Sequence, residues 1–237
     1  MSLLQEQAKD LFNVTLTDEQ IQQFDRYLDE LTDWNSRMNL TAIIEPSAVR
    51  VRHFLDSLSV VNVIDLHQGM GIIDIGSGAG FPGLPLAIAF PDVNVTLLES
   101  TGKKVKFLDH VIKTLDLKNV RTLNARAEDA GHISHHRAKY DLIVARAVAR
   151  LPGLVEYMLP LARVGGHCIA MKGSTAEEEA KDAKRALSVL KGELLGVEML
   201  QLPDVEHPHY LVVIEKSGQT PKQYPRSPGI PTRQPIP

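Results

Sequence analysis

The residues best suited to chemistry lie in one stretch, 72–83, where a short apolar run containing one acid is followed by glycines. Residues 72–75 are apolar apart from Asp74, which is typical of a parallel strand covered on both faces. Glycines follow at positions 76, 78, 80 and 83. A helix is predicted after them, over residues 84–90. A strand, a glycine turn and a helix let backbone N–H groups approach a nucleotide-like ligand, so the stretch predicts a cofactor site.

The spacing of the glycines bears on which cofactor this is. Gly78, Gly80 and Gly83 formally match the dinucleotide pattern, but the turn begins at Gly76, and counted from there Phe81 occupies the third glycine position. An acid two residues before the turn suits a cofactor with a cationic amino-acid end and no pyrophosphate, which favours S-adenosylmethionine. An NAD-dependent oxidoreductase on the same kind of fold remains open, as does a glycine turn that serves packing alone.

Two further charged residues are expected at the same edge of the sheet. Glu99 ends a predicted second strand, 93–99, and such an acid can accept hydrogen bonds from both ribose hydroxyls of an adenosine. Arg146 follows a predicted strand over 140–145. Because ligands of open α/β sheets bind at the carboxyl ends of the strands, Arg146 is expected to project towards the site.

From residue 72 onward, strand and helix patterns alternate, which indicates a doubly wound α/β sheet. Besides the strands above, strands are predicted over 120–125 and 167–171, with an antiparallel pair over 194–202 and 210–215. Helices are predicted over 103–115, 154–162 and 175–191, and Gly165-Gly166 is predicted to form a turn. Before the sheet, helices are predicted over 3–12, 17–37 and about 46–65, with Trp34 on the core face of the second.

The net charge of the 237 residues is only −3, which gives no global indication of nucleic-acid binding. Residues 1–66 contain 11 acids and 5 Lys or Arg, so the rest of the chain is net positive and an anion should bind there. Lys103 and Lys104 begin a predicted helix, where cations oppose the helix dipole. A polyanionic ligand would explain them, and so would an ordinary solvated charge run. The proline-rich tail after Lys216 has a composition that cannot form a core.

Other classes of protein are not indicated. No apolar run approaches ~18 residues and no signal pattern opens the chain, so neither a membrane span nor export is expected. The single cysteine, Cys168, fits a reducing cytoplasm and lies in a predicted buried strand, where it should be inert. The nine histidines lack a zinc-type spacing with cysteine, so no metal site is expected.

Several short motifs accompany the glycine turn in a fixed order, namely Asn39-Leu40-Thr41, Arg52-His53-x-x-Asp56-Ser57, Arg126-Ala127-Glu128, Ala145-Arg146-Ala147-Val148-Ala149 and Lys172-Gly173. Together they resemble the ribosomal RNA small-subunit methyltransferase G family, also called glucose-inhibited division protein B. The resemblance covers essentially the whole chain, including the tail motif at residues 220–229. It implies a class I S-adenosylmethionine-dependent methyltransferase fold, α/β and Rossmann-like, with a mostly parallel seven-stranded sheet and an N-terminal helical extension. The expected regions are 1–66 (helical), 67–216 (methyltransferase domain) and 217–237 (basic tail).

The resemblance also implies an activity, which is methyl transfer from S-adenosylmethionine to N7 of one guanine in the decoding-region loop of 16S ribosomal RNA. The substrate would be that RNA or a precursor of the small ribosomal subunit, and the enzyme a cytoplasmic monomer. Glu99 stands where many members have aspartate. The cofactor contacts expected from the residues and the resemblance together are Asp74, Gly76, Gly78, Phe81, Glu99, Ala127, Glu128 and Arg146.

The residue types agree with a ring nitrogen as the target. Guanine N7 has a free lone pair, so no general base is needed. A carbon-5 pyrimidine methyltransferase would need a cysteine in an active-site loop, where Cys168 does not lie. An exocyclic-amine enzyme would usually have an Asn/Asp-Pro-Pro-aromatic turn in place of Ala145-Arg146-Ala147-Val148.

Arg146 is therefore the residue expected to act in catalysis, by holding the target base or its phosphate. A cationic RNA-binding rim is expected around it, made of Arg52, His53, Lys103, Lys104, Arg126 and Lys172. A catalytically silent RNA-binding factor is the other alternative, although the intact glycine turn and both acids argue against it.

Overall fold

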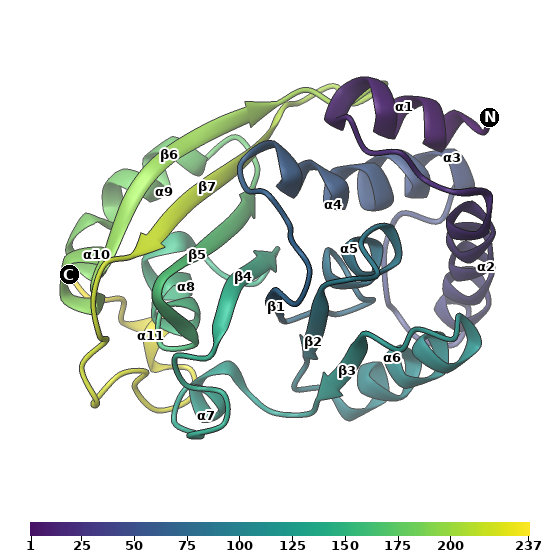
Figure 1. The fold of residues 1–237 in the computed structure, drawn as a ribbon. Coiled ribbons are helices and arrows are strands. Elements are labelled where there is room, and N and C mark those ends of the chain that lie inside the picture. The colour runs from purple at the N-terminus through teal and green to yellow at the C-terminus, as the bar shows by residue number, and fades with distance from the viewer.

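A seven-stranded sheet in the order β3-β2-β1-β4-β5-β7-β6 forms the centre of the computed structural model, which describes residues 1–237 (Figure 1). Neighbouring strands from β3 to β5 are parallel, whereas β7 pairs antiparallel with β5 and β6. The bounds are β1 Gly71–Ile75, β2 Asn94–Leu98, β3 Val120–Leu123, β4 Tyr140–Arg146, β5 Ala162–Lys172, β6 Gly192–Leu200 and β7 His209–Lys216. The predicted mostly parallel sheet with a terminal antiparallel pair is confirmed.

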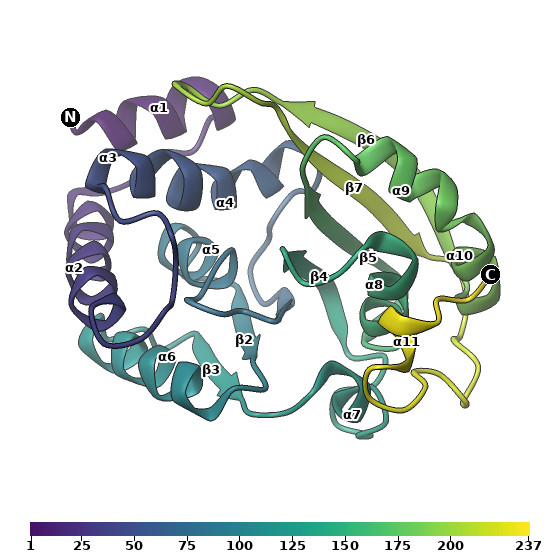
Figure 2. The ribbon, with the colours of Figure 1, turned by 180° about the vertical axis from the view of Figure 1, so that it is seen from behind.

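Helices cover both faces of the sheet (Figures 1 and 2). Those that follow β1 in the chain are α5 Gly83–Ala89, α6 Gly102–Thr114, α7 Ala127–Ala130, α8 Leu151–Met158, α9 Ala176–Asp182, α10 Lys184–Leu190 and α11 Ile230–Arg233. Alternate strand residues face opposite layers: Ile72 belongs to a buried cluster of 39 residues, and Ile73 to another of 26. Burial on both faces explains why the strand at 72–75 is apolar almost without interruption.

The N-terminal region packs on the face formed by α5 and α6. It contains α1 Leu3–Phe12, α2 Asp18–Asn35, α3 Pro46–Val49 and α4 Asp56–Leu58, with a π-helical segment at Arg50–Leu55 and a 3₁₀ segment at Ser59–Asn62. Phe54 is fully buried in this layer and contacts Tyr27, with ring centroids 5.3 Å apart. Trp34 is half-buried beside Phe107, with ring centroids 5.6 Å apart, as expected for a core face. The proposed division of the chain after residues 66 and 216 stays a prediction.

Two predicted element boundaries are wrong. Gly165 and Gly166, predicted as a turn, lie inside β5, where Gly165 adopts φ +76° near a register shift against β4. A glycine inside a strand can mark such an irregularity, and its local signal resembles that of a turn. The helix predicted over 175–191 is divided at Ala183 into α9 and α10.

The tail after Lys216 contributes to the core, contrary to the expectation from its composition. Pro231 and Ile236 are buried, and Ile236 joins the cluster of 26 residues. Figure 2 shows the tail, including α11, lying beside α8. The tail has too few apolar residues for a core of its own, but it docks onto one that already exists. No helix of the chain is long and apolar enough to cross a membrane.

Candidate cofactor and substrate site

The glycine turn after β1 adopts a conformation that only glycine tolerates well. Gly76, Gly78 and Gly80 have φ values of +65°, +58° and +100°. The Gly76 N–H donates to the Leu98 carbonyl at 2.8 Å, which ties the turn to β2. A Cβ at Gly76 would lie 2.8 Å from a methyl carbon of Val148. A side chain at this position would therefore close the space above the strand ends.

The two predicted acids flank this turn. Glu99 follows β2, and its carboxylate accepts from the N–H groups of Gly78 at 3.0 Å and Thr101 at 2.7 Å. Asp74 is completely buried, and its Oδ2 accepts from the Gly83 N–H at 3.0 Å. The Asp74 Oδ1 has no hydrogen-bond partner. Burial raises the pKa of Asp74 to about 7, against an ordinary value of 3.8.

A cavity of about 230 Å³ opens beside the turn, at the carboxyl ends of the first strands. Ligands of open α/β sheets bind at such an edge. Arg126 and Ala127, at the start of α7, contribute to it, together with the buried Glu128. The cavity is lined by Ile75, Gly76, Leu98, Ser100, Ala125, Arg126, Ala127, Glu128, Val148, Tyr157, Gly229 and Thr232. Its place and shape suit the adenosine part of a cofactor.

Arg146, the last residue of β4, lies over the ring of Phe81, with 5.0 Å from its guanidinium carbon to the ring centroid. Its Nη1 donates to Asp56 Oδ2 at 2.8 Å and to the Arg52 carbonyl at 3.0 Å. Its side chain is only 17% exposed. The guanidinium is therefore held in one orientation by the N-terminal helical region.

The carboxylate of Asp56 is the centre of this network. His209 Nδ1 lies 2.7 Å from Asp56 Oδ1, so β4 and β7 both contribute a partner to the same buried acid. Burial alone would raise the pKa of Asp56, but the His209 hydrogen bond and the Arg146 charge outweigh it and lower that pKa.

His53 lies in the site as a neutral ring. Burial, reinforced by the nearby Arg146 charge, lowers the pKa of His53 to about 4. The ring stacks on Phe81 at 4.4 Å between centroids. Thr41 Oγ1 lies 2.8 Å from its Nε2, and Arg146 Nη2 lies 3.0 Å from its Nδ1. The expectation that His53 contributes positive charge to the rim is therefore wrong.

A second cavity, of about 370 Å³, lies on the other side of Arg146. Three of the predicted rim residues, Arg52, His53 and Lys172, meet there with Arg146. Lys172 does not offer a free charge, because its Nζ is 2.8 Å from Glu179 Oε2 and both side chains are about nine-tenths buried. The remaining lining residues are Ile43, Asp56, Ala147, Met171, Gly173, His209, Tyr210 and Leu211.

The other predicted rim residues lie outside this cavity. Lys103 and Lys104 occupy the first turn of α6, and Arg126 precedes α7 beside the cofactor cavity. None of these three side chains, nor that of Arg52, forms an ion pair. Arg52 therefore supplies unpaired positive charge to the surface of the N-terminal region. Lys103, Lys104 and Arg126 supply it to the surface of the later part of the chain.

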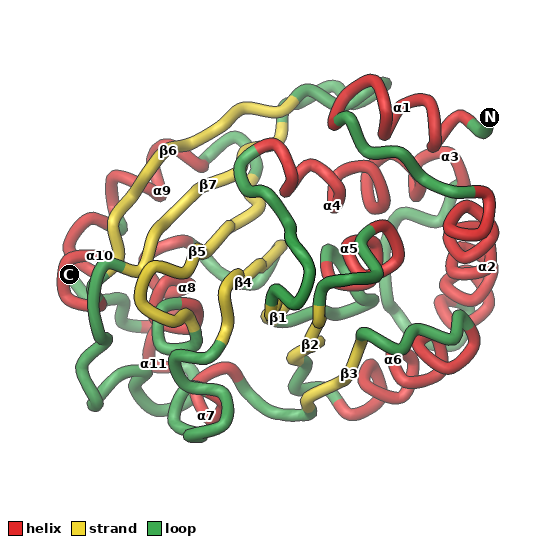
Figure 3. Tube along the Cα trace, in the orientation of Figure 1, coloured by secondary structure: helices red, strands yellow, loops and turns green.

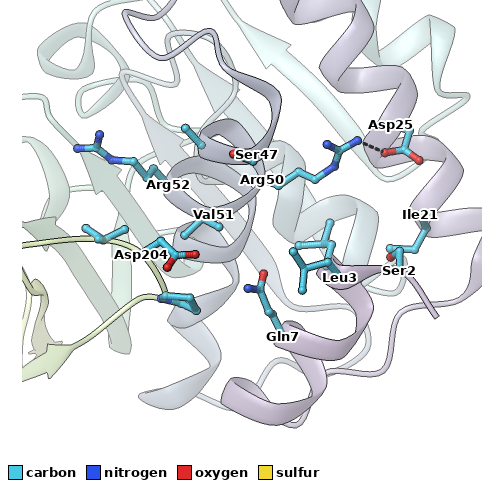
Figure 4. Close-up of a pocket in the computed structure, with 14 residues that line it drawn as sticks. Ser2, Leu3, Gln7, Ile21, Asp25, Ser47, Arg50, Val51, Arg52 and Asp204 are labelled. Atoms are coloured by element: carbon cyan, nitrogen blue, oxygen red, sulfur yellow. Dashed lines mark hydrogen bonds and ion pairs between the residues drawn. The ribbon is translucent and has the colours of Figure 1, made fainter.

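A third cavity, of about 430 Å³, lies among α1, α2, the segment around Arg50 and the β6–β7 connection (Figure 4). Arg50 and Asp25 form an ion pair at its edge, at 2.9 Å. Arg52 lines both this cavity and the one beside Arg146. No residue of the glycine turn reaches it.

The structure indicates neither a metal centre nor a cysteine nucleophile. No three His, Cys, Asp or Glu side chains are placed to hold a metal ion. Cys168 is fully buried in β5, and burial raises the pKa of its thiol to about 12. It is therefore no candidate for a nucleophile.

Comparison with known proteins decides the family. A family model described as rRNA small subunit methyltransferase G (GidB) matches residues 20–207. The chain belongs to this family. Curated proteins named ribosomal RNA small subunit methyltransferase G are 46% identical over 98% of this chain in Desulforamulus reducens and 49% identical over 95% in Roseiflexus castenholzii. The aligned regions cover 97% and 95% of those proteins.

Solved structures support the fold assigned to this member of the methyltransferase G family. TrmN from Thermus thermophilus matches with a TM-score of 0.53 and 18% identity, over 70% of this chain and 53% of that one. TYW2 from M. jannaschii, solved in complex with AdoMet, matches with a TM-score of 0.52 and 17% identity, over 63% and 70%. At such identities the likeness concerns the fold alone, and it confirms the predicted class I architecture.

Sequence reasoning missed the supports of Arg146. Asp56 belonged to a recognised motif, but nothing near it indicated a partner 153 residues away, His209. Gly229 and Thr232 of the tail were also missed, although both line the cofactor cavity. A tail motif was visible in the sequence, but its composition gave no indication of where it docks.

The buried Asp74 gives a pH-dependent prediction. Its folded-state pKa, about 7, lies above its ordinary value of 3.8, so the folded state holds a proton that the unfolded chain releases. Its contribution to the free energy of unfolding should thus decrease as pH rises from about 4 to about 7, by at most ~1.4 kcal/mol per unit, and then stay constant. Asp74→Asn should remove this slope. Urea unfolding of both proteins from pH 5 to 8 measures it, and identical slopes would contradict it.

Proposed function

We propose that this protein transfers the methyl group of S-adenosylmethionine to N7 of a guanine in the decoding-region loop of 16S ribosomal RNA. Membership of the methyltransferase G family supports small-subunit ribosomal RNA as the substrate. The observation that carries the proposal is the position of residues 146–148. Val148 lines the cofactor cavity, while Arg146 and Ala147 line the neighbouring one, so a donor and a base would meet across this short segment.

The residues present fit S-adenosylmethionine. The unpartnered Oδ1 of Asp74 is a ready acceptor beside the glycine turn, and a buried polar atom of this kind is normally satisfied. Gly76 leaves open the space that a Cβ would fill. Glu99, Ala127 and Glu128 would hold the adenosine end, and Gly78 and Phe81 complete the turn. When bound, the sulfonium of this cofactor supplies an electrophilic methyl group.

The protein's own contribution is positioning. As the lone pair of guanine N7 forms a bond to the methyl carbon, the carbon–sulfur bond breaks and its electron pair goes to sulfur, so no proton has to be removed. Arg146 is fixed by Asp56 and Phe81 and can hold O6 of the base or an adjoining phosphate, which leaves N7 facing the methyl group. Such fixed geometry is worth up to ~7–11 kcal/mol.

The RNA is held by localised charge, because the whole chain is net acidic. Arg52, Lys103, Lys104 and Arg126 are the unpaired cations near the two cavities, and we assign them to the phosphate backbone. Lys172 supports the site through Glu179, and the neutral His53 shapes the base cavity. Both halves of the site come from one chain, which supports action as a monomer, and a ribosomal RNA substrate supports action in the cytoplasm.

The direct test is methyl transfer onto 16S ribosomal RNA from a strain that lacks this protein. Tritium from labelled S-adenosylmethionine should enter that RNA. N7 methylation puts a positive charge on the guanine ring, so borohydride and aniline should then cleave the RNA at one position. Incorporation without cleavage would show that the target atom is not N7, and absence of incorporation would contradict the proposed activity.

Replacement of Arg146 tests its role in positioning. Arg146→Ala should lower the methylation rate by on the order of 100-fold or more, with a smaller effect on cofactor affinity. It should also lower stability, because Asp56 loses one of its two partners and stays buried. Arg146→Lys is the matched control for charge, since it keeps the cation and loses the planar guanidinium. Its methylation rate should lie between those of the unmodified protein and Arg146→Ala. Wild-type rates from folded Arg146→Ala protein would exclude the assigned role.

Salt dependence tests the RNA surface. The logarithm of the RNA affinity should fall linearly with the logarithm of salt, by about 0.7 for each phosphate neutralised on a single strand. Lys104→Ala should reduce both affinity and slope. Lys113→Ala, at the opposite end of α6, is the control and should change neither. Filter binding over a range of salt concentrations measures both, and an unchanged slope in Lys104→Ala would remove α6 from the interface.

A further inference from the structure

The tail after β7 is held in place by a buried ion pair. Glu156 of α8 is fully buried, and the guanidinium of Arg226 donates three hydrogen bonds to its carboxylate, of 2.7, 3.0 and 3.1 Å. The Arg226 backbone N–H donates to the same carboxylate at 2.7 Å. A buried carboxylate without this partner would be costly, so α8 is built to receive the tail.

A second arginine fixes the earlier part of the tail. The guanidinium of Arg137 donates to the carbonyls of Thr220, Pro221 and Tyr224 at 2.9, 3.2 and 2.7 Å. Gly153 of α8 gives the later part its room, because a Cβ there would lie 2.7 Å from the Pro231 carbonyl oxygen. These contacts bring the tail along α7 and α8, as Figure 2 shows.

The docked tail ends at the cofactor cavity. Gly229 and Thr232 line that cavity together with Gly76 and Val148. The Gly229 N–H donates to Glu128 Oε1 at 2.8 Å, so a residue assigned above to the cofactor also holds the tail. Gly229 has φ +79°, a conformation that suits glycine. A tail that served packing alone would need no contact with this cavity.

We propose that the docked tail, through Gly229 and Thr232, forms part of the wall of the adenosine part of the cofactor site, so that docking of the tail and binding of an adenosine-containing ligand stabilise each other. The inference deepens the proposed function and rests on it for the ligand. By linkage, the factor by which the docked tail increases ligand affinity equals the factor by which bound ligand favours the docked tail. Both factors can be measured separately.

The first measurement uses the unmodified protein and trypsin. Lys222 and Arg226 are tryptic sites in the tail. Cleavage at Lys222 requires the stretch held by Arg137 to open, and cleavage at Arg226 requires this residue to leave Glu156 of α8. Saturating S-adenosylhomocysteine should slow cleavage at both sites at least ten-fold. Adenosine should also slow cleavage, whereas homocysteine, which lacks the adenosine group, should not. S-adenosylhomocysteine that binds without slowing cleavage would overturn the inference and leave the proposed function intact.

The second measurement compares two single variants by calorimetry with S-adenosylhomocysteine. Gly229→Pro removes the N–H that Glu128 accepts and cannot adopt a positive φ, so affinity should fall at least ten-fold. Gly218→Ala, at the start of the tail, meets nothing closer than 3.5 Å and should bind normally. The fold-decrease in affinity caused by Gly229→Pro should match the fold-decrease in tryptic cleavage rate caused by the ligand. Equal affinity in both variants would overturn the inference, and failure of S-adenosylhomocysteine to bind the unmodified protein would overturn the proposed function with it.

Discussion

A buried carboxylate, that of Asp56, is the constraint on which the arrangement of the site depends. With 2% of its surface exposed, this acid is stable only if nearby groups compensate its charge. Its partners come from distant parts of the chain, Arg146 at the end of β4 and His209 at the start of β7. The same pair of contacts that stabilises the acid also joins the N-terminal helices to the sheet and orients the guanidinium over Phe81. Stability and active-site geometry therefore depend on the same interaction.

The sequence predicts those features that follow from local pattern. The apolar run at 72–75, the glycines after it and the two acids predict the sheet edge and the cofactor turn, because strand burial and positive φ are properties of single segments. The pairing of charges is not a property of one segment, because it depends on which distant residues the fold brings together. Lys172 and His53 were expected to offer positive charge to RNA, but Glu179 compensates the charge of the first and burial keeps the second neutral. The docking of the tail was missed for the same reason, because Arg226 pairs with a glutamate 70 residues earlier in the chain.

The two cavities have different linings, and they meet at the end of β4. Residues 146–148 lie between a cavity that the glycine turn and Glu128 line and one that contains the fixed guanidinium of Arg146. His53 is not placed as a free base, because both of its ring nitrogens have partners. A site of this kind suits a reaction between two reactive partners that need only alignment.

The π-helical segment at Arg50–Leu55 has a consequence for changes in chain length. A π turn closes with i→i+5 hydrogen bonds, so it holds one residue more than an α turn, and it occurs mostly as a single-turn bulge inside an α-helix. Loss of one residue from this segment would therefore convert the bulge into an ordinary α turn and leave the flanking helices in register. The carbonyl of Arg52 lies inside the bulge and accepts from Arg146, so such a change would alter the site only at this contact.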